Sequence, residues 1–312
     1  MMRIVFMGTP EFAVNVLEAL IHSPYEVVGV VTQPDKPVGR KQILTPPPVK
    51  VVAEKYNIPV FQPDKIKLDY EPILAWEPDL IVTCAYGQII PKILLETPPY
   101  KAINVHASLL PKYRGGAPIH KAIIEGEEKT GITIMYMSEK MDEGDIIAQR
   151  EIAIIEDDDV GSLHDKLSKL GAELLMDTLP LIFAKKITPI KQNPAEATYA
   201  YNIKPVDEII RWDKSGKNVY NQIRGLSPFP GAYTILDGKR IKVYKASKQE
   251  TLREGLPGEI IALMKDGVVV HTSDDTAIKL LEVQLEGKTR QSLKDILNGK
   301  HPFEVGKRFT LE

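Results

Sequence analysis

An asparagine, a histidine and an aspartate near the middle of the chain could together transfer an acyl group. Asn104 and His106 lie two residues apart in a run typical of a strand end, so their side chains point to the same face. Asp142 follows in a short loop between two strand-like runs. The amide can stabilise an oxyanion, the imidazole can take part in proton transfer, and the carboxylate can orient the imidazole. We therefore expect these three residues to be catalytic.

Other chemistries have weaker support in the sequence. The first predicted strand ends at Gly8 without the Gly-x-Gly-x-x-Gly pattern, and no phosphate-binding Gly-x-x-x-x-Gly-Lys-Ser/Thr occurs, which argues against NAD or ATP as the reacting partner. No metal is predicted, because His-Glu-x-x-His and Cys-x-x-Cys are absent and the residues after Asp142 lack calcium-loop spacing. The single cysteine, Cys84, is interpreted as a small core residue rather than a catalytic thiol.

Alternating strand-like and helical runs in the first half of the chain predict the sheet that positions the three polar residues. The predicted strands cover residues 3–7, 26–32, 80–85, 103–107 and 132–137. The predicted helices between them cover residues 11–23, 49–56, 70–76 and 117–125. Short apolar strands separated by helices form parallel sheets with both faces covered, so the predicted class is α/β with a Rossmann-like, mostly parallel sheet. A further strand is predicted at 146–154, before a long helix capped by Ser162.

The pattern changes in the last third of the chain. Prolines at Pro189, Pro194 and Pro205 interrupt the periodicity, which predicts a catalytic domain over 1–187, a linker over 188–206 and a second domain over 207–312. The second domain is predicted to begin with a helix at 217–226 and to continue with strands at 232–236, 240–245, 258–264, 268–272 and 277–282. Short strands joined by Asp-Gly turns are typical of a small barrel, and an OB-like fold suits their number.

Composition places the chain among ordinary globular proteins, with 43% apolar and 26% charged residues in 312. No run approaches the ~18 uninterrupted apolar residues of a membrane span, and the first residues enter a strand directly, which predicts no signal peptide. A single cysteine fits a reducing compartment, so a cytoplasmic location is expected. Residues 1–206 carry 22 basic and 27 acidic side chains (−5), whereas 207–312 carry 18 and 15 (+3). This asymmetry would suit a polyanion held by the second part, although three charges also lie within ordinary variation.

The motifs that contain the three polar residues resemble the catalytic core of the folate-dependent formyltransferases. They are Asn-x-His-x-Ser-Leu-Leu-Pro from Asn104, Arg-Gly-x-x-Pro-Ile from Arg114 and Met-Asp-x-Gly-Asp from Met141. The opening Arg-Ile-Val-Phe-Met-Gly-Thr-Pro and the stretch Thr-Gln-Pro-Asp-Lys-Pro from Thr32 are similar to the members of that family that act on methionyl-tRNA. The resemblance covers nearly the whole chain and includes a C-terminal OB-like domain.

The resemblance implies a reaction and its two substrates. The α-amino group of methionyl initiator tRNA attacks the formyl group of 10-formyltetrahydrofolate, a co-substrate, in preparation for translation initiation. Asn104 would donate to the formyl oxygen, and His106, oriented by Asp142, would move protons either as a base or, when protonated, as a second donor. An apolar bend with free backbone groups can hold a flat pterin. The predicted folate-binding residues are Ser108, Leu109, Leu110 and Pro111. No dimerisation segment is recognised, so a monomer is expected.

Two basic segments and one linker residue are predicted to contact tRNA. The connection over 33–50 is far longer than the ~2–6 residues usual at such a junction, and its four basic residues against one acidic residue give 4 − 1 = +3. In the resembling family this insertion enters the acceptor stem, with an arginine at the position of Arg40. Strict alternation over 239–248 places Arg240, Lys242, Tyr244 and Lys248 on one face. The predicted tRNA-binding residues are Lys36, Arg40, Lys41, Lys204, Arg240 and Lys242.

Three other functions are compatible with parts of the sequence. A folate-dependent formyltransferase acting on a small amine, such as an amino-sugar nucleotide, would use the same chemistry without a long basic loop. A formyltetrahydrofolate hydrolase would replace the amine with water. A non-catalytic RNA-binding protein could keep a degenerate Rossmann-like domain, but the complete set of Asn104, His106 and Asp142 disfavours it. The basic loop and basic strand could also be solvated surface segments that bind nothing.

Overall fold

The computed structural model describes residues 1–39, 41–251 and 253–311, and the chain divides into two compact units. The first unit contains residues 1–118, 130–152 and 164–200, and the second contains 119–129, 153–163 and 201–312. The second unit therefore includes two segments that precede residue 164 in addition to residues 201–312. The catalytic-domain, linker and second-domain boundaries expected from the sequence stay predictions.

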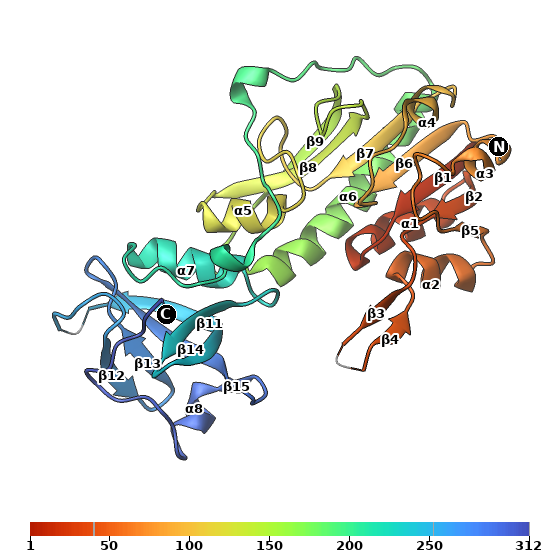
Figure 1. The fold of residues 1–312 in the computed structure, drawn as a ribbon. Helices are drawn as coiled ribbons and strands as arrows, with labels where there is room; N and C mark the ends of the chain where they lie inside the picture. The colour runs from red at the N-terminus through yellow and green to blue at the C-terminus, as the bar shows by residue number, and fades with distance from the viewer. Residues whose placement is uncertain (40, 252, 312) are drawn as a thin grey trace. The chain divides into compact units, whose positions relative to one another are not determined.

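A seven-stranded sheet forms the centre of the first unit, in the order β5-β2-β1-β6-β7-β8-β9 (Figure 1). Its strands are β1 (Arg3–Gly8), β2 (Glu26–Val31), β5 (Val60–Phe61), β6 (Leu80–Cys84), β7 (Ala102–His106), β8 (Lys129–Tyr136) and β9 (Ile146–Ala153). The five neighbouring strands β5, β2, β1, β6 and β7 pair in parallel, whereas β8 runs antiparallel to β7. The predicted Rossmann-like, mostly parallel sheet is confirmed.

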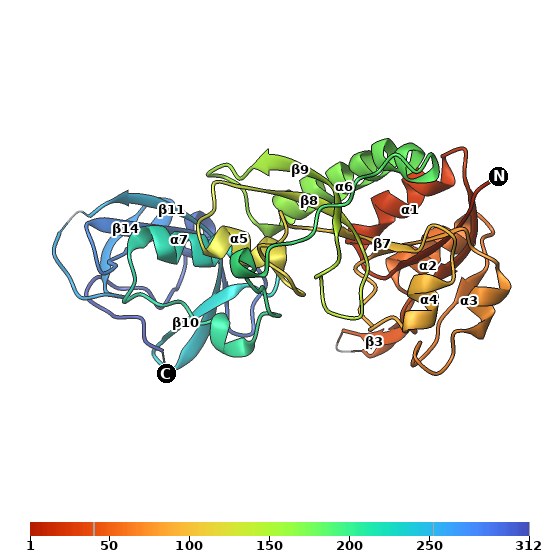
Figure 2. The same ribbon diagram turned by 90° about the horizontal axis from the view of Figure 1, so that it is seen from above.

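Helices cover both faces of this sheet. They are α1 (Val14–Ile21) after a short 3-10 turn at Glu11–Ala13, α2 (Pro48–Lys55), α3 (Glu71–Ala75), α4 (Lys92–Glu96) and α6 (Val160–Phe183). Another helix, α5 (Pro118–Ile124), belongs to the second unit except for its first residue. Figure 2 shows α1 and α6 on the same side of the sheet, where Asn15 Nδ2 donates to Ser168 Oγ at 2.9 Å. Ile73 of α3 and Leu94 of α4 belong to an apolar core cluster with Val5 of β1. Alternate strand residues thus face two separate helical layers.

The cap predicted for α6 is wrong by three residues. The helix begins at Val160, and the carboxylate of Asp159 accepts from the backbone N–H of Ser162 at 2.8 Å. Ser162 in turn accepts from the backbone N–H of Asp159 through its hydroxyl at 3.2 Å. This reciprocal pair satisfies two free helix donors, so an aspartate–serine box sets the start of α6.

The long basic connection between β2 and α2 is structured rather than an open loop. It contains a two-stranded ribbon of β3 (Lys36–Val38) and β4 (Ile43–Thr45). At its base Lys50 Nζ lies 2.9 Å from Asp35, which also accepts from Gln62 Nε2 at 2.8 Å. The Gln62 hydrogen bond and the neighbouring Lys50 lower the pKa of Asp35. Since Lys50 and Asp35 neutralise each other, the free positive charge of the ribbon comes from the residues between them.

The second unit is built on an antiparallel sheet in the order β10-β11-β14-β13-β12, with β15 paired to β14. Its elements are α7 (Gly216–Gly225), β10 (Ala232–Leu236), β11 (Lys239–Glu250), β12 (Ile260–Met264), β13 (Gly267–Val270), β14 (Thr276–Leu285), β15 (Gln291–Ser292) and α8 (Leu293–Ile296). Thr310 bridges to Ile235 on β10, and Arg308 bridges to Glu259 just before β12. The last segment therefore joins the two edges of the sheet, as the predicted OB-like barrel requires.

The predicted basic face of β11 is partly wrong. Arg240 and Lys242 lie on the side opposite the buried Ile241, but the strand pairing with β14 is irregular between Val243 and Ala246. Such an irregularity shifts the alternation of side chains. Beyond it Lys248 points toward α7, where its ammonium lies 5.3 Å from the Tyr220 ring centroid and 2.7 Å from a Glu156 oxygen. Lys248 therefore does not extend the surface that carries Arg240.

Candidate active site

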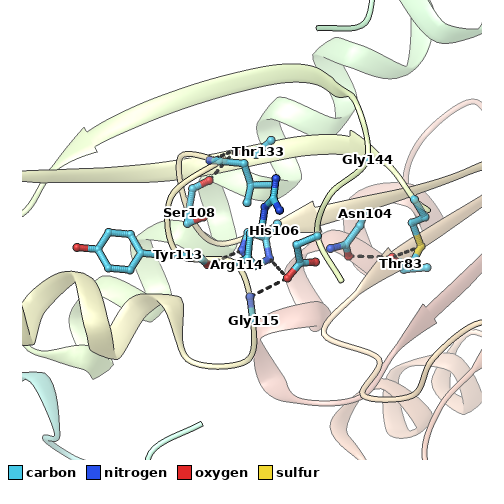
Figure 3. Close-up of polar contacts among 12 residues, drawn as sticks. Thr83, Asn104, His106, Ser108, Tyr113, Arg114, Gly115, Thr133 and Gly144 are labelled. Carbon is cyan, nitrogen blue, oxygen red and sulfur yellow. Dashed lines mark hydrogen bonds and ion pairs between the residues drawn. The ribbon is translucent and has the colours of Figure 1, made fainter. Parts of the chain in front are cut away.

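Asn104 and His106 are carried by β7, near the carboxyl end of the strand. Parallel pairing places Thr83 of β6 beside Asn104 on one side, and antiparallel pairing places Met135 of β8 on the other. The Thr83 hydroxyl donates to Asn104 Oδ1 at 2.8 Å (Figure 3). The amide Nδ2 of Asn104 makes no hydrogen bond within the described part of the chain. It is therefore available to donate to a bound substrate.

A backbone carbonyl fixes the orientation of the His106 ring. His106 is buried, with 7% of its surface exposed, and its Nε2 lies 3.0 Å from the carbonyl oxygen of Tyr113 (Figure 3). A carbonyl oxygen can only accept a hydrogen bond, so Nε2 carries a hydrogen. In the neutral imidazole Nδ1 is then the basic nitrogen, and the ring can take up a proton only there.

Asp142 faces that basic nitrogen. Its Oδ2 lies 3.8 Å from His106 Nδ1, beyond hydrogen-bond distance, and accepts from the backbone N–H of Gly115 at 2.8 Å. The carboxylate can stabilise an imidazolium through its charge, while the Tyr113 carbonyl holds the ring. Asp142 has φ 54, a left-handed conformation that aspartate tolerates better than most residues. The predicted trio is therefore brought together, with the ring oriented mainly by a group that the sequence did not indicate.

A buried network holds the loop that carries Asp142. Gln192 Nε2 donates to the carbonyl oxygens of Asp142 at 2.7 Å and Gly144 at 2.8 Å. Gln192 Oε1 accepts from Nε and Nη2 of Arg114 at 3.1 and 2.8 Å. Arg114 is only 3% exposed, and its Nη1 also lies 3.1 Å from Glu143. The guanidinium and the amide thus tie together the segments on either side of the trio.

Two glycines are required by the close approach of backbone around this loop. A Cβ added at Gly144 would lie 1.7 Å from the carbonyl oxygen of Tyr136. Gly115 has φ +117, and a Cβ there would lie 2.8 Å from the carbonyl oxygen of Ala200. The glycines of the two recognised motifs therefore allow Asp142 and its backbone donor to come within hydrogen-bond distance.

The predicted folate-binding stretch leaves β7 and packs beside β8. The Ser108 hydroxyl donates to the carbonyl of Lys112 at 2.7 Å, and the backbone N–H of Leu110 donates to Thr133 Oγ1 at 3.1 Å. Leu110 is buried with Met135 and Ile146. The side chains of Leu109 and Pro111 are half-buried. A folate-binding role for this stretch stays a prediction. Leu109 and Pro111 are the two of its apolar side chains that a ligand could contact.

The predicted tRNA contacts differ in how accessible their charges are. Lys36 and Lys41 are exposed on the ribbon, and Arg40 lies outside the described residues. Lys204 is exposed and precedes a 3-10 turn at Pro205–Asp207. Arg240 stacks over the Tyr233 ring at 3.8 Å, whereas Lys242 Nζ donates to the Pro230 carbonyl at 2.7 Å. The two side chains line a hollow of about 150 Å³ together with Gln284, Leu285, Glu286 and Gly287.

The structure supports the interpretation of Cys84 as a core residue. Cys84 is fully buried in β6, and burial raises the pKa of its thiol, which disfavours the reactive thiolate. Among the described residues, no three histidine, cysteine, aspartate or glutamate side chains gather as metal ligands would. Within the same residues, no helix is long and apolar enough to cross a membrane.

The Rossmann-like sheet presents an amide donor and an imidazole on β7, and the loop between β8 and β9 adds a carboxylate, a set that can act on a carbonyl-containing group. A formyl transferase family model matches residues 2–179, and a model of the formyl transferase C-terminal domain matches residues 202–301. The chain belongs to the formyl transferase family.

Two relatives match nearly the full length of the chain. Methionyl-tRNA formyltransferase of Bacillus licheniformis is 58% identical over 301 residues, which cover 96% of this chain and 95% of the relative. Methionyl-tRNA formyltransferase of Bacillus mycoides is 59% identical over 308 residues, which cover 98% of each.

A more distant protein shares the fold. The structure of HypX from Aquifex aeolicus in complex with tetrahydrofolic acid superimposes with a TM-score of 0.63 at 19% identity. The alignment covers 100% of this chain and 51% of HypX, so the chain spans about half the length of that protein. At this identity the likeness concerns the fold alone.

Proposed function

We propose that this chain transfers the formyl group of 10-formyltetrahydrofolate to the α-amino group of methionyl initiator tRNA. The observation that carries the proposal is the identity of 58% and 59% to the two methionyl-tRNA formyltransferases over almost the whole chain. The site supports it, because the amide donor, imidazole and carboxylate required for formyl transfer lie together at the end of β7.

In the proposed reaction the amine nitrogen of the methionyl group attacks the formyl carbon. A nitrogen–carbon bond forms, and the carbonyl electrons move to the formyl oxygen, where Asn104 Nδ2 donates to the oxyanion. One such donor is typically worth ~10²–10³ in rate. The amine gives up a proton to His106 Nδ1, and the Asp142 charge stabilises the resulting imidazolium. The oxyanion electrons then re-form the carbonyl as the bond between the formyl carbon and N10 breaks. N10 takes the proton held at His106 Nδ1, which yields tetrahydrofolate and formylmethionyl-tRNA and restores the neutral imidazole.

The remaining predicted residues bind the two substrates in this proposal. Ser108, Leu109, Leu110 and Pro111 line the pterin site, where the half-buried Leu109 and Pro111 supply apolar contact. Lys36, Arg40 and Lys41 on the ribbon contact the acceptor stem. Lys204, Arg240 and Lys242 contact the phosphate backbone, to which basic side chains supply sequence-independent affinity. We propose further that the enzyme is a monomer and acts in the cytoplasm. Size-exclusion chromatography of the purified protein tests the oligomeric state.

The sharpest test is direct product analysis. The protein is incubated with methionyl-tRNA and 10-formyltetrahydrofolate, the ester is hydrolysed, and the released amino acid is identified by mass spectrometry. Formylmethionine is the expected product, and it should be absent with an Asn104→Ala/His106→Ala double variant. Release of formate without formylmethionine would indicate a hydrolase. Formylation of an amino-sugar nucleotide but not of methionyl-tRNA would indicate the small-amine enzyme instead.

A further inference from the structure

Thr83 makes a contact with the active site that the reaction described above does not use. It lies in β6, is 2% exposed, and is the direct register partner of Asn104 in the parallel ladder. Its Oγ1 lies 2.8 Å from Asn104 Oδ1, 3.1 Å from the carbonyl oxygen of Ile103 and 3.2 Å from Met137 Sδ. A hydroxyl has one hydrogen to donate, and the shortest of the three contacts is the one to the Asn104 amide.

We propose that Thr83 is a positioning residue for formyl transfer, whose hydroxyl holds the Asn104 amide with Nδ2 facing the substrate. The inference rests on the proposed function, because it assigns Asn104 the role of oxyanion donor. By accepting the Thr83 hydrogen, Oδ1 is fixed against β6, and Nδ2 is left on the opposite side of the amide. Thr83 itself touches neither substrate.

The physical need for such a residue follows from the shape of an amide. The oxygen and nitrogen of asparagine are nearly equal in size, so packing alone does not distinguish the two orientations of the group. Rotation by half a turn would direct Oδ1 toward the formyl oxygen, where two negative partial charges would repel each other. In that turned orientation the hydroxyl would accept from Nδ2 and donate to the Ile103 carbonyl oxygen, 3.1 Å away. The 2.8 Å contact to the amide is typical of O–H···O, whereas 3.1 Å is long for such a bond, so the distances favour the productive orientation.

The orientation effect can be separated from a structural effect by kinetics. Thr83→Val replaces the hydroxyl with a methyl group of similar size, and Thr83→Ser keeps the hydroxyl. Thr83→Ala is measured alongside, because it removes the same hydroxyl without adding a buried methyl group. Thr178→Val is the matched control: Thr178 is also 2% exposed, but its hydroxyl donates to Leu174 within α6. Each variant is assayed for formylation of methionyl-tRNA, with thermal unfolding as the measure of folding.

We expect Thr83→Val and Thr83→Ala to lower kcat by roughly 3- to 10-fold, the effect of one net hydrogen bond, with KM for both substrates unchanged. Thr83→Ser should restore at least half of wild-type kcat, and Thr178→Val should leave kcat unchanged.

A double-mutant cycle with Asn104→Ala tests the mechanism itself. If Thr83 acts only through the amide, Thr83→Val should have no effect on kcat once Asn104 is alanine. An equal loss of kcat in both backgrounds would overturn the proposal, as would wild-type kcat in folded Thr83→Val and Thr83→Ala. An increase in kcat would show that Thr83 holds the amide in the opposite orientation. Wild-type protein that forms no formylmethionyl-tRNA would instead refute the proposed function, so the two failures are distinguishable.

Discussion

Replacing Gln192 with leucine should disable the active site without touching any of the three proposed catalytic residues. Leucine has nearly the shape of glutamine but removes both donors to the carbonyls of Asp142 and Gly144, together with the acceptor shared by two Arg114 nitrogens. Losing two neutral hydrogen bonds costs about 0.5–1.5 kcal/mol each, and a buried charged group left unsatisfied costs about 1.5–3 kcal/mol. Arg114 retains Glu143, so the lower part of the sum, about 3 kcal/mol, is expected.

Thermal unfolding and steady-state kinetics test this expectation. A loss of about 3 kcal/mol should lower the unfolding temperature of the first unit by roughly 6–12 °C, given about 2–4 °C per kcal/mol for a unit of this size. Because the Asp142 loop loses its attachment, kcat for formylation should fall by ~10²-fold, as displacements of about 1 Å do in other enzymes. KM should change little, since none of the lost contacts involves a residue assigned to substrate binding.

The chain offers a matched control for this variant. Gln222 bridges two backbone carbonyls in the same manner, with Nε2 donating to Asp207 at 3.0 Å and Ile209 at 2.7 Å, but it belongs to the second unit. Gln222→Leu should destabilise the protein while leaving kcat unchanged. Gln192→Glu keeps an acceptor for Arg114 but faces the two carbonyls with negative charge, so it should also lose kcat. Wild-type kcat in Gln192→Leu at a temperature where it is folded would refute the role of the network.

Three further predictions concern the proposed site, the ribbon and the linker. Asn104→Ala and His106→Ala should each lower kcat by ~10² or more with little change in tRNA affinity, measured by filter binding, and near-native turnover in both would remove them from the site. Arg40→Ala should lower kcat/KM for methionyl-tRNA and reduce the log–log salt slope of tRNA binding by about one unit, so an unchanged slope over a salt series would count against a phosphate contact. Chymotrypsin should cut the native protein after Tyr201 before Tyr199, because the backbone groups of Thr198 and Ala200, on either side of Tyr199, are hydrogen-bonded to Arg114; an earlier cut at Tyr199, seen by mass spectrometry of the first fragments, would count against this.

The sequence was most informative where chemistry and local geometry coincide in one short segment. Asn104 and His106 could be placed on one face because a strand has a period of two, and β7 carries both. The position of Asp142 depends on tertiary structure, but it follows a recognisable motif. Gln192 lies neither in a predicted strand nor in a recognisable motif. It is 50 residues beyond Asp142, in a proline-rich segment that the sequence predicts to be a linker. A single polar residue there gives no indication of the loop that it holds.

Strand order and strand irregularities explain the other differences. Thr83 reaches Asn104 only because β6 and β7 are neighbours, and the order of strands in a parallel sheet is not encoded in the periodicity of either strand. The face of Lys248 was mispredicted because alternation was extended through the irregular pairing at 243–246. Hydrophobic periodicity predicts a regular strand, and an irregularity inside a strand depends on its partner.

The two halves of the site are stabilised in different ways, and this difference should separate the effects of mutations. Asn104 sits on a central strand between β6 and β8, so its position is set by the sheet, and only the rotation of its amide needs a specific partner. The other half, His106 with its partners Tyr113 and Asp142, depends on loops. Tyr113 and Asp142 both adopt positive φ, a backbone conformation that costs free energy unless surrounding contacts offset it. Those contacts are the Gly115 N–H and the Gln192 amide. Substitutions in the loop network should therefore lower stability and kcat together, whereas Thr83→Val should lower kcat with a much smaller change in stability.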